Sequence, residues 1–250
     1  MKKLSLLLLL SAVLAPAFTT AATAPQTAEA AIEKHLAAMG GREALAKLTS
    51  RKSTGTVTIS TAGGDLSGPV EISSKAPNKS RAYTELDLSA MGMSEKMILD
   101  QRFDGTKGWV LNSLRGDSEM PASQQASQRN NMFPTQFLSY KEAGTTVALL
   151  PSEKVGTKDA VVLMVTPKAG PATKMFLDPD TYLLMRSSGK AESPEVGEFE
   201  QVSEPSDYRA VDGIKIPFMI VTTAPMQTVT IKLTKVEHNV AIDDALFGGR

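Results

Sequence analysis

The sequence predicts a mainly β protein, built as a curved antiparallel sheet with a few helices. Two Asp-Gly pairs, Asp104-Gly105 and Asp212-Gly213, each separate two apolar runs. This pattern is a strong signal for a tight hairpin turn, because glycine readily takes the positive φ that such a turn needs. From Gly55 onward, apolar and polar residues alternate with a period of two, which is typical of a sheet with one buried face and one wet face.

The first 24 residues are expected to be a signal peptide that is removed on export. Lys2 and Lys3 give a short positive start, and the apolar stretch from Leu4 to Leu14 is too short to span a membrane. Small residues at positions 21–24 offer cleavage sites. We therefore expect residues 25–250 to form a single domain that is soluble and periplasmic.

Composition excludes several classes of function. The 250 residues carry 27 basic and 27 acidic side chains and no long basic run, so electrostatic capture of nucleic acid has no support. The chain has no cysteine. Disulfides, thiolate nucleophiles, cysteine metal sites and lipid-modified cysteines are therefore excluded.

Helices are expected at the start of the domain and in one insert. Residues 27–39 carry apolar side chains at helical spacing, Thr27 could cap them, and Gly40-Gly41 ends them. A second short helical turn covers residues 42–48. A polar stretch followed by apolar residues predicts a helical or irregular insert over Ala122–Tyr140, the sizeable interruption of the sheet.

Strands are predicted on both sides of this insert. The expected strands are residues 55–61, 70–72, 81–88, 97–103, 108–111, 146–150, 160–166, 173–177, 182–187, 198–202, 214–220 and 228–234. Trp109, the single tryptophan, is expected to anchor the first hairpin in the interior, and Pro217 predicts an edge or bulge position in its strand. The tail after Asn239 is expected to tuck apolar residues back against the sheet.

The sequence gives little support for catalysis, a cofactor or a metal site. It contains no nucleophile elbow, phosphate loop, His-Glu-x-x-His or dinucleotide fingerprint. His35 has no ligand partner four residues away and fits a buried helix position, and His238 stands alone near the last strand. The acidic pairs Asp178/Asp180 and Asp243/Asp244 lack the spacing of a calcium loop and fit turns better.

The 12 methionines are more suggestive, because several lie in the least regular segments. Methionine is flexible and is used where a surface must adapt to varied apolar partners. The alternative is that these side chains simply fill an uneven core. We predict a hydrophobic ligand site lined by Met91, Met93, Met97, Trp109, Met132, Phe133 and Phe137.

Four segments, in this order, resemble the periplasmic outer-membrane lipoprotein-sorting proteins of the LolA/LolB type, nearest to their divergent branch. The segments are residues 32–41, 103–109, 176–183 and 207–218. The resemblance implies an open, unclosed β-barrel whose concave apolar face is covered by helices and accepts acyl chains. It also implies a LolA-like lipid-binding domain over residues 25–250. Because the chain lacks a lipobox cysteine, the membrane-anchored acceptor role is not supported.

Three functions stay open at this point. The favoured one is a non-enzymatic carrier or chaperone for an acylated lipoprotein or another lipophilic ligand, with peripheral membrane contact compatible with that role. The second is a binding or sensor module that docks an envelope protein through the same face or a sheet edge. The third is an unrecognised hydrolase.

Overall fold

One antiparallel sheet of 13 strands forms the body of the protein. A computed structural model describes residues 25–89, 92–193 and 196–249, so the predicted signal peptide lies outside the described residues. The strands are β1 Ser50–Thr61, β2 Gly64–Lys75, β3 Lys79–Asp87, β4 Lys96–Phe103, β5 Gly108–Asn112, β6 Ser118–Glu119, β7 Thr146–Val155, β8 Lys158–Thr166, β9 Thr173–Leu177, β10 Leu184–Ser193, β11 Gly197–Val211, β12 Ile214–Ala224 and β13 Gln227–His238.

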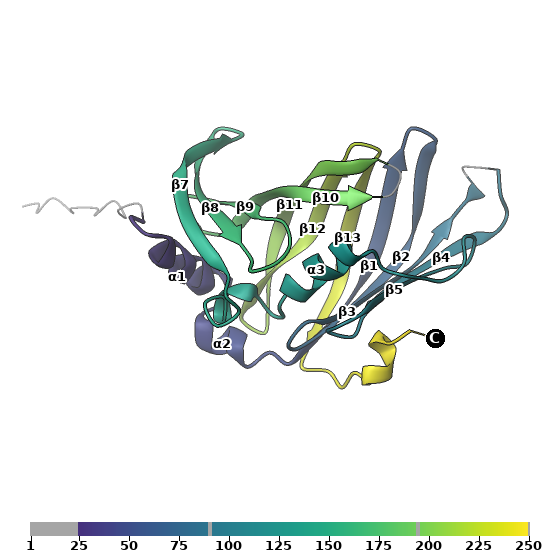
Figure 1. The fold of residues 1–250 in the computed structure, drawn as a ribbon, viewed down its shortest axis with the longest axis horizontal. Coiled ribbons are helices and arrows are strands. Elements are labelled where there is room, and N and C mark those ends of the chain that lie inside the picture. Colours follow the sequence, from purple (N-terminus) through teal and green to yellow (C-terminus); the bar gives the residue numbers. More distant parts are fainter. Residues whose placement is uncertain (1–24, 90–91, 194–195, 250) are drawn as a thin grey trace, which may run out of the picture.

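The sheet is curved but does not close into a barrel. Its order is β6-β5-β4-β3-β2-β1-β13-β12-β11-β10-β9-β8-β7, so the two ends of the order, β6 and β7, are edges that do not pair with each other. Pairing between β1 and β13 joins the first half of the sheet to the second half (Figure 1). The predicted fold class, a mainly β protein with an unclosed antiparallel sheet, is therefore confirmed.

The helices are few and short. Within the described residues they are α1 Ala28–Met39, α2 Arg42–Ala46, α3 Ala122–Asn130 and the 3-10 turns η2 Gln136–Leu138 and η3 Asp244–Phe247. The Thr27 hydroxyl accepts a hydrogen bond from the Ala30 amide at 3.1 Å, which caps α1. Gly40, at φ 127°, ends the helix in a backbone conformation that favours glycine. Both predicted ends of α1 are confirmed.

Both Asp-Gly turns are present and link neighbouring strands. In the first turn, Gly105 has φ 103°, and the Asp104 carboxylate accepts hydrogen bonds from the amides of Thr106 and Lys107, each at 2.8 Å. In the second, Asp212 and Gly213 both have positive φ, 51° and 80°, which is the geometry of a two-residue hairpin turn.

Trp109 does not anchor the first hairpin in the interior. Phe103, just before the turn, is completely buried, whereas Trp109 is half-buried. Trp109 lies opposite Arg102 in the β4–β5 register, and its ring packs against Gly249. Because neighbouring residues of a strand point to opposite faces, Phe103 and Trp109 lie on different sides of the sheet. The prediction of a buried Trp109 is wrong.

Pro217 is also placed differently from the prediction. It lies in β12, which is an internal strand between β11 and β13, so the edge position is wrong. The β11–β12 register runs through Pro217 without a shift. On the other side, the pairing of β12 with β13 begins only at Met219. Pro217 therefore lies where the ladder toward β13 has stopped, and its missing amide interrupts no paired segment on that side.

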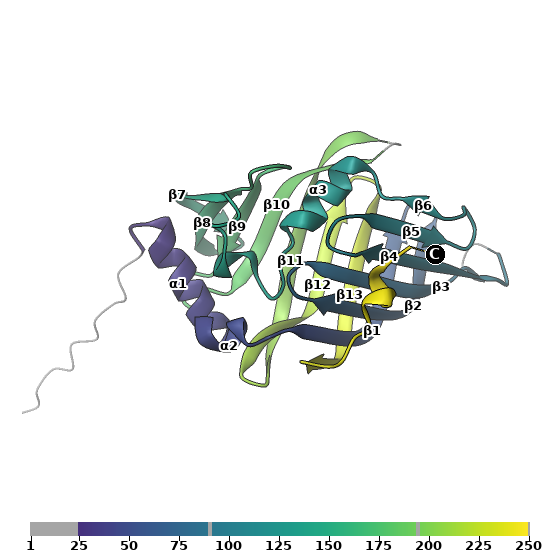
Figure 2. The same cartoon turned by 60° about the horizontal axis from the view of Figure 1, so that its bottom comes forward.

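The C-terminal segment packs on the convex face of the sheet, beside β3 and β4 (Figure 2). Phe247 is fully buried there. The Arg102 guanidinium donates to the Gly248 carbonyl at 3.1 Å, and Lys75 and Lys79 both reach the Asp244 carboxylate at 2.7 Å. The expectation that the tail tucks back against the sheet is confirmed.

Candidate functional site: an incompletely covered concave face

Apolar side chains lie on both halves of the concave face of the sheet, but only part of this face is covered. In the covered part, α1 and the 131–140 segment pack on β7–β9 and β12, with Leu163 at 0%, Phe137 at 1% and Ile214 at 2% exposure. In the open part, the apolar cluster on β1–β4 and β13 has three buried members, Val57, Val70 and Leu86. Six partly buried neighbours surround them, namely Ile59, Leu66, Ile72, Met97, Val229 and Ile231.

Side chains of the open part share one face because of the strand register. Val57 lies opposite Ile231 on β13 and opposite Gly68 on β2. The same face continues through Leu86 to Met97 on β3 and β4. Alternation with period two turns the polar residues between them to the convex face. The open part is therefore a continuous apolar surface rather than a set of isolated side chains.

The insert lies across the concave side, as the sequence predicts. In Figure 1, α3 crosses in front of the sheet. The Ser80 hydroxyl donates to the Gln128 side chain at 3.3 Å, and the Asn130 amide donates to the Ala169 carbonyl at 2.7 Å. These two contacts place α3 as a bridge between β3 and the connection after β8. It covers the concave face at one end and leaves the open part of the sheet partly exposed.

Arg51 is the charged side chain that the fold brings onto this face. It lies opposite Ser74 on β2 and His238 on β13, in phase with Ser53 and Val57. Its guanidinium carbon lies 5.5 Å from the centre of the Phe133 ring, a cation–π distance. Burial lowers the pKa of the Arg51 guanidinium. Within the described residues no carboxylate pairs with it.

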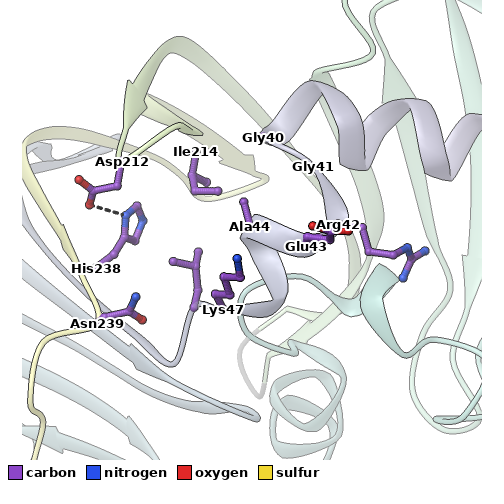
Figure 3. Close-up of a pocket in the computed structure, with 11 residues that line it drawn as sticks. Gly40, Gly41, Arg42, Glu43, Ala44, Lys47, Asp212, Ile214, His238 and Asn239 are labelled. Carbon is purple, nitrogen blue, oxygen red and sulfur yellow. Dashed lines mark hydrogen bonds and ion pairs between the residues drawn. The ribbon is translucent and has the colours of Figure 1, made fainter.

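A hollow of about 720 Å³ lies where α2 meets the ends of β12 and β13 (Figure 3). His238, whose side chain is 2% exposed, lines it with Ile214 and Lys47. The Nδ1 atom of His238 lies 3.2 Å from an Asp212 carboxylate oxygen. Its Nε2 atom is buried and has no hydrogen-bond partner among the described residues. The buried Nε2 atom is therefore available to form a hydrogen bond with a group bound in the hollow.

One end of the sheet carries exposed apolar side chains. Met226 is 68% exposed in the β12–β13 turn, Leu114 is 47% exposed after β5, and Met93 is 40% exposed before β4. The register puts these connections at the same end, because Thr61 lies opposite Gln227 and Ser67 lies opposite Asp87. We call this end the apolar rim. The opposite end carries the polar Asp104 and Asp212 turns.

The structure brings together part of the predicted ligand site. Met97 lies in the open part, Phe137 is buried in the covered part, and Phe133 lies over Arg51. Met132 is half-buried beside Phe133. Three predicted residues lie elsewhere or are not described: Met93 is at the apolar rim, Trp109 is on the convex face, and Met91 lies outside the described residues.

Sequence reasoning missed Arg51 and the contact between His238 and Asp212. The signal for Arg51 is present in the alternation, because it is in phase with the apolar residues Val57 and Ile59. No such signal exists for His238, whose neighbour Asp212 is 26 residues away and reaches it only through the hairpin. His35, in contrast, is buried on α1 as expected, with Nδ1 donating to the Tyr182 carbonyl at 2.8 Å.

Residues 25–89, 92–193 and 196–249 lack two kinds of feature. They contain no group of three or more histidine, aspartate or glutamate side chains placed to hold a metal ion. They also contain no helix long and apolar enough to cross a membrane.

Solved structures with the same architecture exist at low sequence identity. A LolA superfamily protein from Nitrosomonas europaea is 13% identical with a TM-score of 0.58, covering 90% of this chain and 99% of its own. A putative outer membrane lipoprotein-sorting protein domain from Vibrio parahaemolyticus is 10% identical with a TM-score of 0.57, covering 87% and 94%. A DUF1329 family protein from Desulfovibrio piger is 15% identical with a TM-score of 0.57, covering 88% and 96%.

No sequence-family profile and no curated protein match this chain. The likeness is therefore one of architecture, carried by the open 13-stranded sheet with helices on its concave side. The chain has a LolA-like fold.

Proposed function

We propose that this protein is a non-catalytic periplasmic carrier or chaperone that binds an acyl chain or another lipophilic ligand on the open part of its concave face. The observation that carries the proposal is the contrast within one face of one sheet. Most apolar side chains of the cluster under α1 are buried, whereas in the cluster on β1–β4 and β13 the three buried residues Val57, Val70 and Leu86 are surrounded by six that are only partly buried. A contiguous apolar surface of this kind marks an interaction site more often than a free surface.

The energetics favour an acyl chain as the occupant. Burying a methylene group contributes about 0.8 kcal/mol. A chain with about ten methylenes therefore gains about 8 kcal/mol before the costs of association. The six partly buried side chains around Val57 would lose their remaining contact with water in the same step.

The apolar rim gives the proposed carrier a place for peripheral membrane contact. Met226, Leu114 and Met93 project from separate turns at the end of the sheet beside the open part. Single exposed apolar residues are common on protein surfaces, but several at one end indicate contact with an apolar partner. A lipophilic ligand could pass from a membrane to the concave face at this end without crossing the polar Asp-Gly turns.

The fold and the leader give further support. Solved proteins described as LolA superfamily and lipoprotein-sorting domains share the architecture. Because a fold hosts many functions, this likeness supports the proposal without carrying it. The apolar leader, which we interpret as a signal peptide, supports a location in the envelope, where lipoproteins and lipids are moved.

Titration with a fluorescent acyl probe tests the proposal. We expect saturable binding that weakens at least tenfold in Ile231→Asp, which puts a charge on the open part of the concave face. The matched control is Thr230→Asp on the same strand, because its side chain points to the other face. Both variants must still melt cooperatively. Absence of binding by folded, delipidated wild-type protein would remove the carrier function.

A partner-docking module is the second candidate, since the same apolar rim could hold a protein. Native mass spectrometry of material from the periplasm separates the two. Co-purified lipid supports the carrier, and a stoichiometric protein supports the docking module.

A further inference from the structure

Arg51 places a positive charge on the apolar concave face without an internal counter-charge. Its two cross-strand neighbours are Ser74 and His238, and the next residue of β1 on the same face is Ser53. None of these side chains is an anion. In the hollow beside His238, the Asp212 carboxylate is already engaged with the His238 Nδ1 atom.

Two other arginines in this half of the sheet differ from Arg51, because each has an anionic partner. Arg81 and Arg102 lie on the convex face, and both pair with Asp100, at 2.8 and 2.7 Å. Asp100 is 2% exposed at its side chain, so this cluster is a buried charge with its partners present. Buried or half-buried charges are normally paired in this way, because removing an ion from water is costly.

The contact with Phe133 stabilises the charge of Arg51 but leaves its hydrogen-bond donors without acceptors in the part of the chain that the structure describes. A guanidinium over an aromatic ring gains from the ring face but keeps its five N–H donors in its own plane. Within the described residues no hydrogen bond to a carboxylate or carbonyl uses these donors. Two of them form a fork that matches the two oxygens of a carboxylate or a phosphate.

The position of Arg51 relative to the open part fits the head of an amphiphile. Strand β1 continues on the same face from Arg51 through Val57 to Ile59. The row along β1 from Arg51 to Ile59, with Ser53 and Gly55 before Val57, spans about 27 Å, so an alkyl chain with its head at Arg51 could lie along it. Ile59 lies near the β1–β2 turn, at the end that carries the apolar rim.

We propose that Arg51, held over Phe133, binds the anionic head group of an amphiphilic ligand whose alkyl chain lies along the open part of the concave face. The inference rests on the proposed carrier function and specifies its ligand class. The head group is a carboxylate or a phosphate, as in a fatty acid or an acidic lysolipid. A neutral or cationic amphiphile would leave the guanidinium unpaired.

Calorimetric titration with dodecanoate, dodecyl phosphate and dodecanol tests this inference. Wild-type protein is expected to bind the two anions about tenfold more tightly than the alcohol, since a charge-assisted hydrogen bond contributes on this scale. Arg51→Met keeps the stem of the side chain but removes the charge, and is expected to bind all three equally. Arg51→Lys is expected to retain part of the preference, because it restores the charge without the fork.

Arg209→Met is the matched control. Arg209 also lies over an aromatic ring, 4.5 Å from the centre of Phe218, but it is paired with Asp207. We expect this variant to keep the wild-type preference. Comparison of dodecanoate with dodecyl phosphate then assigns the carboxylate or the phosphate as the better head group.

Two results would overturn the inference while leaving the carrier function intact. One is equal binding of the three amphiphiles by wild-type protein, and the other is an unchanged anion preference in Arg51→Met that melts cooperatively. Equally tight binding of inorganic phosphate and dodecyl phosphate would show a bare anion site that makes no use of the alkyl chain, and would also overturn the inference. Failure of wild-type protein to bind any of the three, dodecanol included, would instead remove the carrier function itself.

Discussion

The covered and open parts of the concave face carry similar apolar side chains, but these side chains differ in their exposure to water. Under α1, Ile32, Leu36 and Phe137 complete a core with the strands behind them. On the open part, Ile72, Met97 and Ile231 stay partly accessible. In both parts apolar side chains point to the concave face, although β8 carries apolar side chains on both of its faces. What separates a core from a candidate binding surface in this protein is therefore the cover, not the sheet.

Size explains why the cover is incomplete. A helix of 12 residues is about 18 Å long. Thirteen strands spaced about 4.8 Å apart span about 58 Å across the sheet. The short helix α1 and the bridging insert cannot seal a face of that width, and an unsealed apolar face calls for another partner.

The largest expected effect tests the covered part. Phe137→Ala removes a ring that is 1% exposed and packs edge-on against both His35 and Tyr140. We expect a loss of about 3–5 kcal/mol in the free energy of unfolding, as for other large-to-small core changes. Urea melts measure it. A loss below about 1 kcal/mol would mean that the insert does not seal this part of the face.

Truncation of an apolar side chain in the open part should lower the free energy of unfolding by a smaller amount. For Ile72→Ala we expect about 2 kcal/mol, at the low end for this change, because the side chain is already partly in water. Affinity for an acyl probe should fall in the same variant. If the loss matched that of Phe137→Ala and probe binding were unchanged, the open part would be ordinary core and the comparison would fail.

Trp109→Ala probes the convex face. The ring is half-buried and is covered on one side by Gly249. We expect a loss of about 1–2 kcal/mol, well below the value for a fully buried aromatic ring. Phe103→Ala, at the buried position of the same hairpin, is the matched comparison. A larger loss for Trp109→Ala than for Phe103→Ala would contradict the register of β4 and β5.

Acid should loosen the covered part before the open part. Burial lowers the pKa of His35, which donates from Nδ1 to the Tyr182 carbonyl. A depressed histidine pKa means that the unfolded state binds the proton more readily. The contribution to stability is then complete above about pH 6.5, the ordinary histidine value, and is lost as the pH falls below it.

Hydrogen exchange of the α1 amides between pH 7 and 5 measures this loss. We expect protection of α1 to fall more steeply than protection of β1, and the difference to disappear in His35→Gln. Carboxylates with a lowered pKa titrate below about pH 4 and stay outside this window. Equal loss of protection in α1 and β1 would show that His35 does not control the cover.

The smallest effect is expected at the C-terminal segment. Hydrogen bonds from Lys75 and Lys79 lower the pKa of Asp244 to about 2. The group therefore stabilises the folded state above its ordinary value near 3.8, and the stabilisation is lost as the pH falls toward 2. Because the carboxylate is exposed, we expect a small decrease in the thermal midpoint for Asp244→Asn at low salt and none at high salt. A decrease that persists in high salt would indicate a packing role instead.

Much of the local structure was predictable. The Thr27 cap and Gly40 fix the ends of α1, and the two Asp-Gly pairs fix hairpins, because each device acts within a few residues. Alternation also identified most strands. It did not identify the full length of β11, which runs as one strand from Gly197 to Val211, since its polar residues gave no clear apolar phase.

Part of the candidate site was predictable as well. Met97, Phe133 and Phe137 reach the concave side, but Trp109 was assigned to the wrong face. The reason is register: the turn places Phe103 opposite Gly108, and a shift of one residue would exchange the faces. A lone tryptophan in a hairpin does not reveal which of the two faces it occupies.

The sequence by itself determined the elements, their turns and the apolar alternation, because these depend on contacts within a few residues. Only the tertiary structure decided which apolar residues are covered and which charges are unpaired. Arg51 lies opposite His238, 187 positions later in the chain, only because β1 pairs with β13. Its place beside Phe133 depends on where the insert crosses the sheet. Such pairings between distant segments leave no local pattern, so the candidate site could be read only from the folded chain.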